Sequence, residues 1–155
     1  MPYRPSVLSV IVTFLLILSY VFLPRYGFVG FSGFWEHVLY PFSHANIFHL
    51  LANVVCVLAL LPRFGWMELL FGYLVSVLSS FLPCFCSEPT MGFSGVLFAL
   101  VGESWGVVGR FKEMLMKNKW FLLIPMFLPH VNGFIHLYCL LGGYLVGRLK
   151  MKDER

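Results

Sequence analysis

The sequence has 155 residues, of which 59% are hydrophobic and 18% aromatic, while only 12% carry a charge. A soluble domain is usually about a quarter charged, so this composition excludes an ordinary soluble protein and predicts an all-α membrane protein. The net charge of +4 does not indicate a nucleic-acid partner, because the Lys and Arg residues lie in short segments beside apolar runs. The length predicts a single domain over residues 1–155, with no separate soluble module.

Apolar runs recur along the chain, each close to the length needed to cross a hydrocarbon core of roughly 30 Å. They predict six transmembrane helices, at residues 6–23, 44–61, 65–82, 92–109, 114–129 and 133–149. A signal peptide is the alternative for the first run, but no small-residue cleavage site follows it. The fifth run is the weakest, because its apolar centre, Trp120 to Leu128, covers only about 13 Å at 1.5 Å per residue. It crosses the membrane only if Met114 to Lys119 continue the same helix.

The placement of the 11 Lys and Arg residues tests this number of spans. With both termini in the cytoplasm, Arg25 alone faces outward and the other ten of the 11 lie on the inner side. The positive-inside rule demands this asymmetry, and a count of five spans would break it. We therefore expect a multi-pass integral membrane protein with both termini in the cytoplasm.

Polar side chains gather at the outer ends of three of the predicted spans. His44 and His49 belong to the second span, Ser94 to the fourth and His136 to the sixth. Polar groups inside a membrane are costly and generally face a protein interior or a water-filled cavity. Hydrogen bonding between helices is the simpler explanation for any one of them, but their shared depth favours a single site.

The spacing of the polar residues on the second span separates them into two groups. His49 and Asn53 are four residues apart, so they share one helix face, one turn apart. His44 comes five residues before His49, which rotates it away from that face and places it nearer the water. We therefore expect His44 to lie at the start of the helix rather than to act with Asn53.

Glycine spacing on the last span suggests which helix it contacts. His136, Gly143 and Gly147 are separated by seven and four residues, so they form one stripe. Gly143 and Gly147 are a pair of small residues that permits close approach of another helix. If this stripe packs on the fourth span, His136 lies beside Ser94, with Phe98 one turn further along and under the imidazole. A His beside a Ser is the arrangement of a nucleophile with its general base.

Proteolysis inside a membrane can use a Ser–His pair, a bound metal or a pair of Asp residues, and this chain lacks the residues for the last two mechanisms. No His-Glu-x-x-His stretch is present, as a metalloprotease would need. The one Asp is Asp153, in the C-terminal tail, so an aspartyl pair is absent. His44 and His49 are poorly spaced to bind a metal from one helix face, and no third ligand accompanies them. We expect neither a metal nor a cofactor, and the Ser–His route remains.

These motifs resemble those of the rhomboid intramembrane serine proteases. "HANIFHLLAN", from His44 to Asn53, fits the family pattern His-x4-His-x3-Asn, and "GFSG", from Gly92 to Gly95, fits Gly-x-Ser-Gly. His136 precedes a glycine-rich stretch, and the match extends over residues 35–147 with the motifs in family order. The chain resembles a small bacterial rhomboid of the minimal six-helix type, which implies a six-helix membrane bundle in the bacterial cytoplasmic membrane.

The resemblance implies a role for each residue of the site. Ser94 would be the nucleophile and His136 the general base, without an acid. His49, Asn53 and the backbone N–H of Ser94 would donate to the oxyanion, and His44 would be structural. The substrates would be transmembrane proteins, cut near the outer part of the bilayer after their helix becomes extended.

Two alternative functions remain open. A rhomboid-like protein that binds transmembrane helices without cutting them is the nearer one, although members of that kind usually lack the Ser or the His. A small transporter or channel subunit is the more remote one, because it predicts ionisable residues across the midplane rather than at one depth.

Glu68 and Glu103 are the carboxylates within the predicted spans. Glu103 lies nine residues after Ser94, about 13 Å further along the helix, so it approaches the inner surface. We expect both carboxylates to reach that surface rather than to act in the site. Cys84 and Cys86, in the outer loop before Ser94, have no expected catalytic task.

Overall fold

The computed structural model describes residues 5–30, 32–83, 88–120 and 131–153. The helices are α1 (Val7–Phe22), α2 (Phe34–Leu39), α3 (Ile47–Leu60), α4 (Trp66–Ser80), α5 (Ser94–Val108), α6 (Phe111–Lys117) and α8 (Gly133–Asp153). Two short 3-10 turns flank α3, namely η1 (Tyr40–Phe42) and η2 (Leu61–Arg63). The described part of the chain is otherwise helical or irregular, with one isolated antiparallel bridge between Phe28 and Thr90. The predicted all-α class is confirmed.

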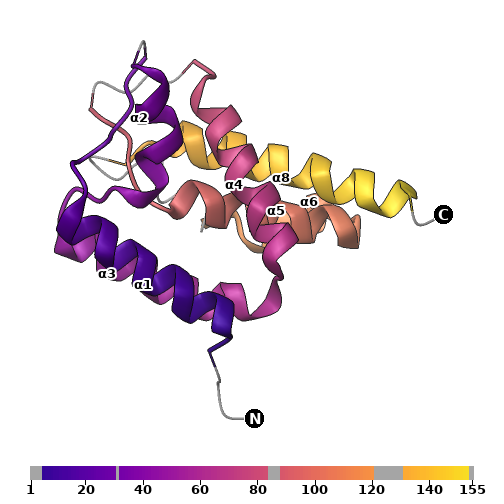
Figure 1. Ribbon diagram of the computed structural model, residues 1–155. Helices are drawn as coiled ribbons and strands as arrows, with labels where there is room; N and C mark the ends of the chain where they lie inside the picture. The colour runs from indigo at the N-terminus through magenta and orange to yellow at the C-terminus, as the bar shows by residue number, and fades with distance from the viewer. Residues whose placement is uncertain (1–4, 31, 84–87, 121–130, 154–155) are drawn as a thin grey trace.

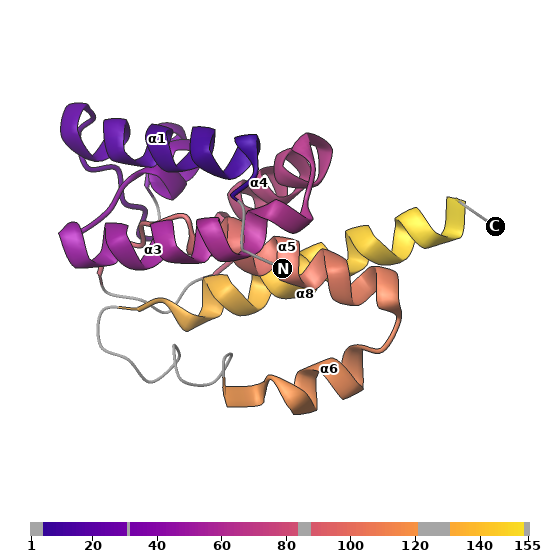
Figure 2. The same cartoon turned by 90° about the horizontal axis from the view of Figure 1, so that it is seen from below.

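Helices α5 and α8 form the centre of the bundle and lie side by side (Figure 1). Helix α4 packs against both of them. Helix α1 pairs with α3 on one side of this centre, while α6 lies on the opposite side (Figure 2). The first residues of α5 and of α8 therefore meet at one end of the bundle, since the two helices run parallel.

Glycines let α5 and α8 approach each other closely. Gly143 and Gly147 of α8 face the backbone of α5, and Gly102 and Gly106 of α5 face the backbone of α8. A Cβ atom at any of these four positions would overlap backbone atoms of the other helix. The predicted glycine stripe on α8 is confirmed, and α5 carries a matching pair that the sequence analysis did not identify.

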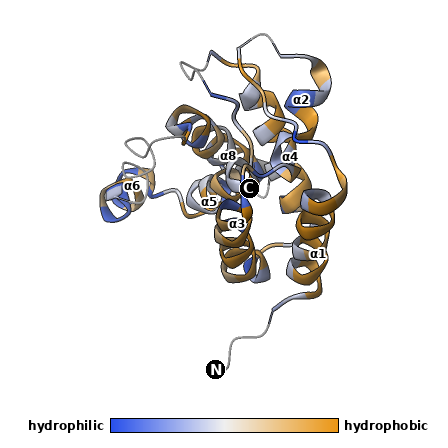
Figure 3. Ribbon diagram, turned by 90° about the vertical axis from the view of Figure 1, so that its left-hand side faces the viewer, coloured by the Kyte–Doolittle hydropathy of each residue, from blue (hydrophilic) through white to orange (hydrophobic). Residues whose placement is uncertain are grey.

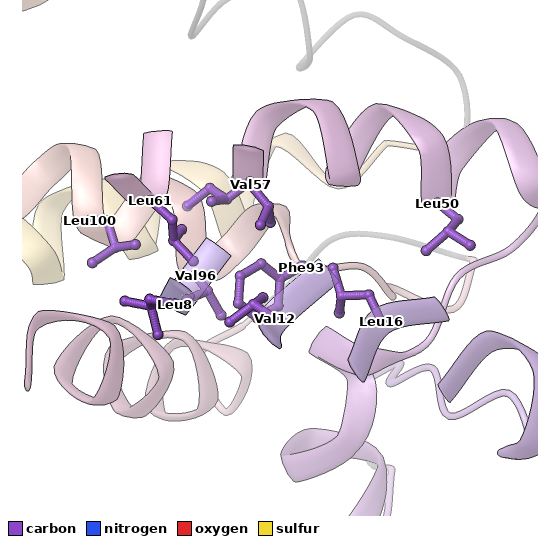
Figure 4. Close-up of a cluster of buried hydrophobic side chains, with 10 residues drawn as sticks. Leu8, Val12, Leu16, Leu50, Val57, Leu61, Phe93, Val96 and Leu100 are labelled. Atoms are coloured by element: carbon purple, nitrogen blue, oxygen red, sulfur yellow. The ribbon is translucent and has the colours of Figure 1, made fainter. Parts of the chain in front are cut away.

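A buried apolar cluster joins α1, α3 and the start of α5 (Figure 4). Leu8, Val12 and Leu16 recur at every fourth residue, so they form one stripe along α1. The cluster contains Leu8, Val12, Leu16, Leu50, Val57, Leu61, Phe93, Val96, Leu97 and Leu100. Because Phe93 directly precedes Ser94 and is only 2% exposed, this cluster fixes the point at which α5 begins.

The outward faces of the helices are also apolar. On α1, Val7 and Phe22 are each 75% exposed, and Phe14 and Val21 are 59% and 63% exposed. Figure 3 shows α1 and α3 coloured mostly as hydrophobic. A soluble monomer rarely exposes so continuous an apolar surface, so these faces require an apolar environment.

The helices coincide with most of the predicted spans. Helices α1, α4 and α5 lie within the runs 6–23, 65–82 and 92–109, and α8 continues beyond the run 133–149 to Asp153. Among the described residues, no single helix satisfies on its own the length and hydropathy of a bilayer-crossing helix. The segments Phe34–Phe42 and Ile47–Arg63 satisfy them only together, and they are bent by 71° relative to each other.

Two predicted helix boundaries are wrong. Helix α3 begins at Ile47 rather than at His44, because the Asn46 side chain caps it by accepting the His49 backbone N–H at 2.9 Å. Helix α6 ends at Lys117 and the chain turns at Asn118, so Met114 to Lys119 are not one continuous helix. The remainder of the predicted fifth span, residues 121–130, lies outside the described residues, as do Cys84 and Cys86.

The expectation that Glu103 reaches the surface is also wrong. Its side chain is only 4% exposed, and the Lys150 ammonium forms an ion pair with it. Glu68 is partly exposed and lies 3.5 Å from the same Lys150 nitrogen. Lys150 thus provides the cation that the buried Glu103 carboxylate requires. The three charges join α4, α5 and α8 at the end of the bundle opposite to Ser94.

Candidate active site

Ser94 and His136 meet where the N-terminal ends of α5 and α8 come together. Ser94 is the first residue of α5, and His136 lies in the first turn of α8. A hydrogen bond of 2.8 Å joins Ser94 Oγ to His136 Nε2. His136 is buried, with 7% of its surface exposed, whereas Ser94 is only partly buried. The adjacency expected from the glycine stripe is confirmed.

Phe98 supports the imidazole of His136. The two rings are stacked, with centroids 4.3 Å apart and planes 9° apart, as expected from the spacing of Phe98 one turn after Ser94. The other ring nitrogen, His136 Nδ1, is buried and has no hydrogen-bond partner among the described residues. The orientation of the imidazole therefore depends on Phe98 and on Ser94 Oγ, with no acidic residue of the described chain bonded to it.

The loop before Ser94 brings the backbone of Gly92 against α3. Gly92 has a φ of 115°, a left-handed conformation that favours glycine. A Cβ atom at Gly92 would lie 2.7 Å from His49 Nε2 and 3.6 Å from Asn53 Nδ2. Both side chains from the shared face of α3 thus reach the same point of the loop, two residues before Ser94. A side chain at Gly92 would displace the His49 ring.

Asn53 has one amide hydrogen that its own helix does not use. Its side chain is buried and donates one bond from Nδ2 to the His49 carbonyl at 2.9 Å. An amide nitrogen carries two hydrogens, so a second donor remains. The backbone N–H of Ser94 is also unused within α5, because the first residues of a helix have no intrahelical acceptor. The site thus offers the Asn53 amide, the His49 ring and the Ser94 N–H as candidate donors around one point.

His44 lies behind His49 and outside this group of donors. It belongs to the segment before α3, and its side chain is 1% exposed. Its ring contacts the His49 ring edge-on, with centroids 5.2 Å apart. A residue in this position can hold the His49 ring in place, which is the supporting position that the resemblance implies for His44.

Tyr40 binds the loop directly before Ser94, called the serine loop below, and the sequence analysis did not identify this residue. Its carbonyl accepts the Gly92 N–H at 2.9 Å, and its hydroxyl donates to the Ser76 carbonyl at 3.1 Å. Gly95, directly after Ser94, fits against these groups: a Cβ atom there would lie 2.7 Å from the hydroxyls of both Tyr40 and Ser76. No spacing in the sequence marks Tyr40, because its partners come from α4 and from the loop before α5.

A cavity of about 530 Å³ opens beside the Ser–His pair. Its wall includes Ser94, His136, His49 and Asn53, and it extends along α3 to Leu60. Cavities of about 300–1,000 Å³ are the usual size of small-molecule sites, so this cavity is large enough to hold a ligand beside the serine hydroxyl.

A comparison of the sequence with known families gives one match over most of the chain. Residues 32–152 match the family model described as the rhomboid domain. The chain belongs to the rhomboid family. Membership makes it an integral membrane protein, which accounts for the exposed apolar faces of its helices.

Two plant proteins are among its relatives in the rhomboid family. RHOMBOID-like protein 7 of Arabidopsis thaliana is 30% identical over 138 residues, covering 74% of this chain and 42% of the relative. RHOMBOID-like protein 1 of the same plant is 28% identical over 132 residues, covering 73% of this chain and 33% of the relative. The chain thus spans less than half of the length of these curated relatives.

Proposed function

We propose that this rhomboid-family chain is an intramembrane serine endopeptidase that cuts transmembrane proteins in or near their membrane-spanning segments. The observation that carries the proposal is the 2.8 Å hydrogen bond between Ser94 Oγ and His136 Nε2 at the edge of a cavity. A serine hydroxyl becomes an effective nucleophile only when a base takes its proton, and this hydrogen bond supports His136 as that base.

The proposed reaction has two halves. In the first, Ser94 Oγ attacks the substrate carbonyl carbon while its proton passes to His136 Nε2. The tetrahedral adduct collapses, the C–N bond breaks, and His136 gives the proton to the leaving amine. In the second half, a water molecule attacks the acyl ester, His136 takes its proton, and the ester bond to Ser94 breaks with return of that proton to Oγ.

We propose that the developing oxyanion is stabilised by three donors. These are the second amide hydrogen of Asn53, the ring of His49 and the backbone N–H of Ser94. Their proximity to Gly92 supports this role, because the two α3 side chains and the start of α5 converge there. Removing one such donor in a serine protease typically lowers kcat by about 10²–10³-fold.

The proposed substrates are transmembrane helices that unwind locally. A helical peptide bond is shielded by its own hydrogen bonds, so a segment must become extended before Ser94 can reach its carbonyl. The cavity beside Ser94 runs along α3 past Asn53 to Leu60 and is walled largely by apolar residues, which suits side chains from a membrane segment.

We further propose that both termini face the cytoplasm of a bacterial cell. The positive-inside rule supports this orientation, because it assigns all but one of the 11 Lys and Arg residues to the inner side. The proposed location in the bacterial cytoplasmic membrane follows the small rhomboid type that the sequence resembles.

A fluorophosphonate probe on the purified protein tests the proposed activity, together with cleavage of a transmembrane substrate in lipid vesicles. We expect the wild-type chain to be labelled and to cleave, and Ser94→Ala and His136→Ala to do neither while remaining folded. Ser104→Ala is the matched control, since Ser104 lies on the same helix and its hydroxyl bonds the Val101 carbonyl. Cleavage by correctly inserted Ser94→Ala protein, or capture of transmembrane helices without labelling of the wild type, would contradict the proposal.

A further inference from the structure

A chain of hydrogen bonds connects three separate segments beside the Ser–His pair. The backbone of Thr90 forms an antiparallel bridge with Phe28, through N–H to carbonyl bonds of 2.9 and 3.1 Å. The Thr90 side-chain oxygen in turn accepts a bond of 2.7 Å from the Asn132 amide. The loop after α1, the loop before α5 and the start of α8 are thereby tied together at the end of the bundle that holds Ser94.

Asn132 determines how α8 begins. Its Oδ1 accepts the Ile135 N–H at 3.3 Å, which is the bond that an N-cap residue makes to the first turn of a helix. His136 follows one turn after Asn132. The amide of Asn132 therefore acts at both ends, because its oxygen caps α8 and its nitrogen binds the loop of Thr90.

Thr90 restricts the position of Ser94, the other member of the Ser–His pair. It precedes Ser94 by four residues, and the intervening Gly92 is held by its bond to the Tyr40 carbonyl. Phe28, the partner of Thr90, is 1% exposed and packs against the Tyr40 ring with centroids 4.8 Å apart. The short path from Thr90 to Ser94 consequently has little freedom to move.

The hydrogen bond between the Thr90 and Asn132 side chains is called the tie below, and both of these side chains are buried at the cavity. Thr90 is 8% exposed and Asn132 7% exposed, and both line the cavity together with Ser94 and His136. A buried amide that loses its partner keeps the full cost of desolvation, so this bond strongly favours one relative position of the two segments. The segments concerned are the ones that carry the hydroxyl and the imidazole.

The geometry points to Thr90 and Asn132 as positioning residues that hold the His136 ring in register with Ser94 Oγ. This inference rests on the proposed protease function. The side-chain bond between them ties the start of α8 to the serine loop at the level of the pair, whereas the glycine contacts act further along both helices. Without it, α8 stays packed on α5, but its first turn and the imidazole are free to shift relative to the hydroxyl.

Three variants distinguish the effect of the hydrogen bond between Thr90 and Asn132 from the effect of the Asn132 cap on α8. Thr90→Val keeps the shape of the side chain and the cap of α8 but removes the acceptor. Asn132→Ser keeps a capping oxygen but is too short to reach Thr90. Thr90→Ser retains the hydroxyl and is the conservative variant. Ser80→Ala is the matched control, because it removes a buried hydroxyl that bonds His37 at 2.9 Å rather than a group beside the dyad.

The measurements are the rate of fluorophosphonate labelling, kcat and KM for a transmembrane substrate, and the melting temperature, all in one detergent. We expect Thr90→Val and Asn132→Ser each to lower kcat and the labelling rate by about three- to tenfold per folded molecule, at unchanged KM. The double variant should lose no more than the worse single one, because both remove the same bond. Thr90→Ser should recover most of the rate, and Ser80→Ala should lower only the melting temperature.

Three results overturn the inference. If Thr90→Val and Asn132→Ser label and turn over at the wild-type rate, the tie does not position the dyad, although the proposed protease still stands. A rate loss that only follows the unfolded fraction, as for Ser80→Ala, also assigns the bond a purely structural role. Failure of the wild-type chain to be labelled or to cleave overturns the protease proposal, and this inference with it.

Discussion

The imidazole of His136 lies flat on the ring of Phe98, with the two planes only 9° apart. Phe98 is on α5 and His136 on α8, so this contact joins the two helices that carry the proposed nucleophile and base. A flat contact of this kind restricts rotation of the imidazole about its Cβ–Cγ bond. It leaves the Nε2 nitrogen directed at Ser94 Oγ.

We therefore expect Phe98→Leu to slow the reaction more than it destabilises the fold. Leucine fills part of the volume but provides no flat ring, and an aromatic pair contributes about 0.5–1.5 kcal/mol beyond its buried area. The labelling rate of Ser94 should fall by about two- to tenfold at constant folded fraction. Phe14→Leu, on the exposed face of α1, is the control and should label normally; equal rates for both variants would show that the stacked ring is not needed.

The oxyanion assignment distinguishes Asn53 and His49 from His44. Asn53→Ala should lower kcat by about 10²-fold with little change in KM, because the lost donor acts mainly in the transition state. His49→Ala should behave similarly, with some added loss of packing. His44→Ala should lower the melting temperature, with turnover following the folded fraction. If His44→Ala instead lost activity at unchanged stability while Asn53→Ala kept a normal kcat, the assignment would be wrong.

The glycine contact between α5 and α8 predicts a strong position dependence of alanine substitutions. Gly143→Ala should destabilise the chain by about 1–3 kcal/mol, because its methyl group would overlap the backbone of Ala99 and push the helices apart. Gly142→Ala is the control on the same helix, since its methyl group would meet only the Val75 side chain. Thermal melting in one detergent compares them. Equal melting temperatures would contradict close backbone packing.

The buried ion pair predicts unequal effects of its two members. Lys150→Met leaves Glu103 buried without its cation and should cost about 2 kcal/mol, less than a fully buried pair because the Lys150 side chain is 31% exposed. Glu103→Gln should cost less, since the Lys150 ammonium can extend to the surface. The double variant should recover stability relative to Lys150→Met. Lys152→Met, at an exposed neighbouring position, is the control for the melting measurements.

Reporter fusions test the proposed orientation. Fusions after Arg110 and after Lys152 should report the cytoplasm, and a fusion after Pro83 should report the outer side, because basic residues remain inside. A C-terminal reporter on the outer side would remove one span and place His136 and Ser94 at opposite membrane surfaces.

Regular spacing made part of the site predictable from the sequence. Gly143 and Gly147 repeat on one face of α8, and His136 continues that face, so a single packing assumption places it beside Ser94. His49 and Asn53 are likewise related by one helical turn. These relationships depend only on the geometry of single helices and on the small size of glycine.

The remaining features depend on contacts between distant segments. Nothing near Tyr40 in the sequence indicates that its carbonyl binds Gly92. Glu103 was expected at the surface because its depth alone suggested a solvated carboxylate, whereas Lys150 from another helix reaches it. The sequence does indicate the cap at Asn132, since an Asn immediately before a helix is a common N-cap. It gives no indication of the hydrogen bond from Asn132 to Thr90. The Asn46 cap likewise could have indicated that α3 begins after His44.

The parallel packing of α5 and α8 also has a consequence for biosynthesis. Ser94 and His136 are 42 residues apart in the chain, so the ribosome completes the helix of the proposed nucleophile well before that of its base. Until α8 has been inserted and has docked on α5, the serine hydroxyl has no group to take its proton. Under the proposed protease function, a chain whose α8 has not docked would therefore lack its general base, and cleavage would begin only once these two helices have assembled.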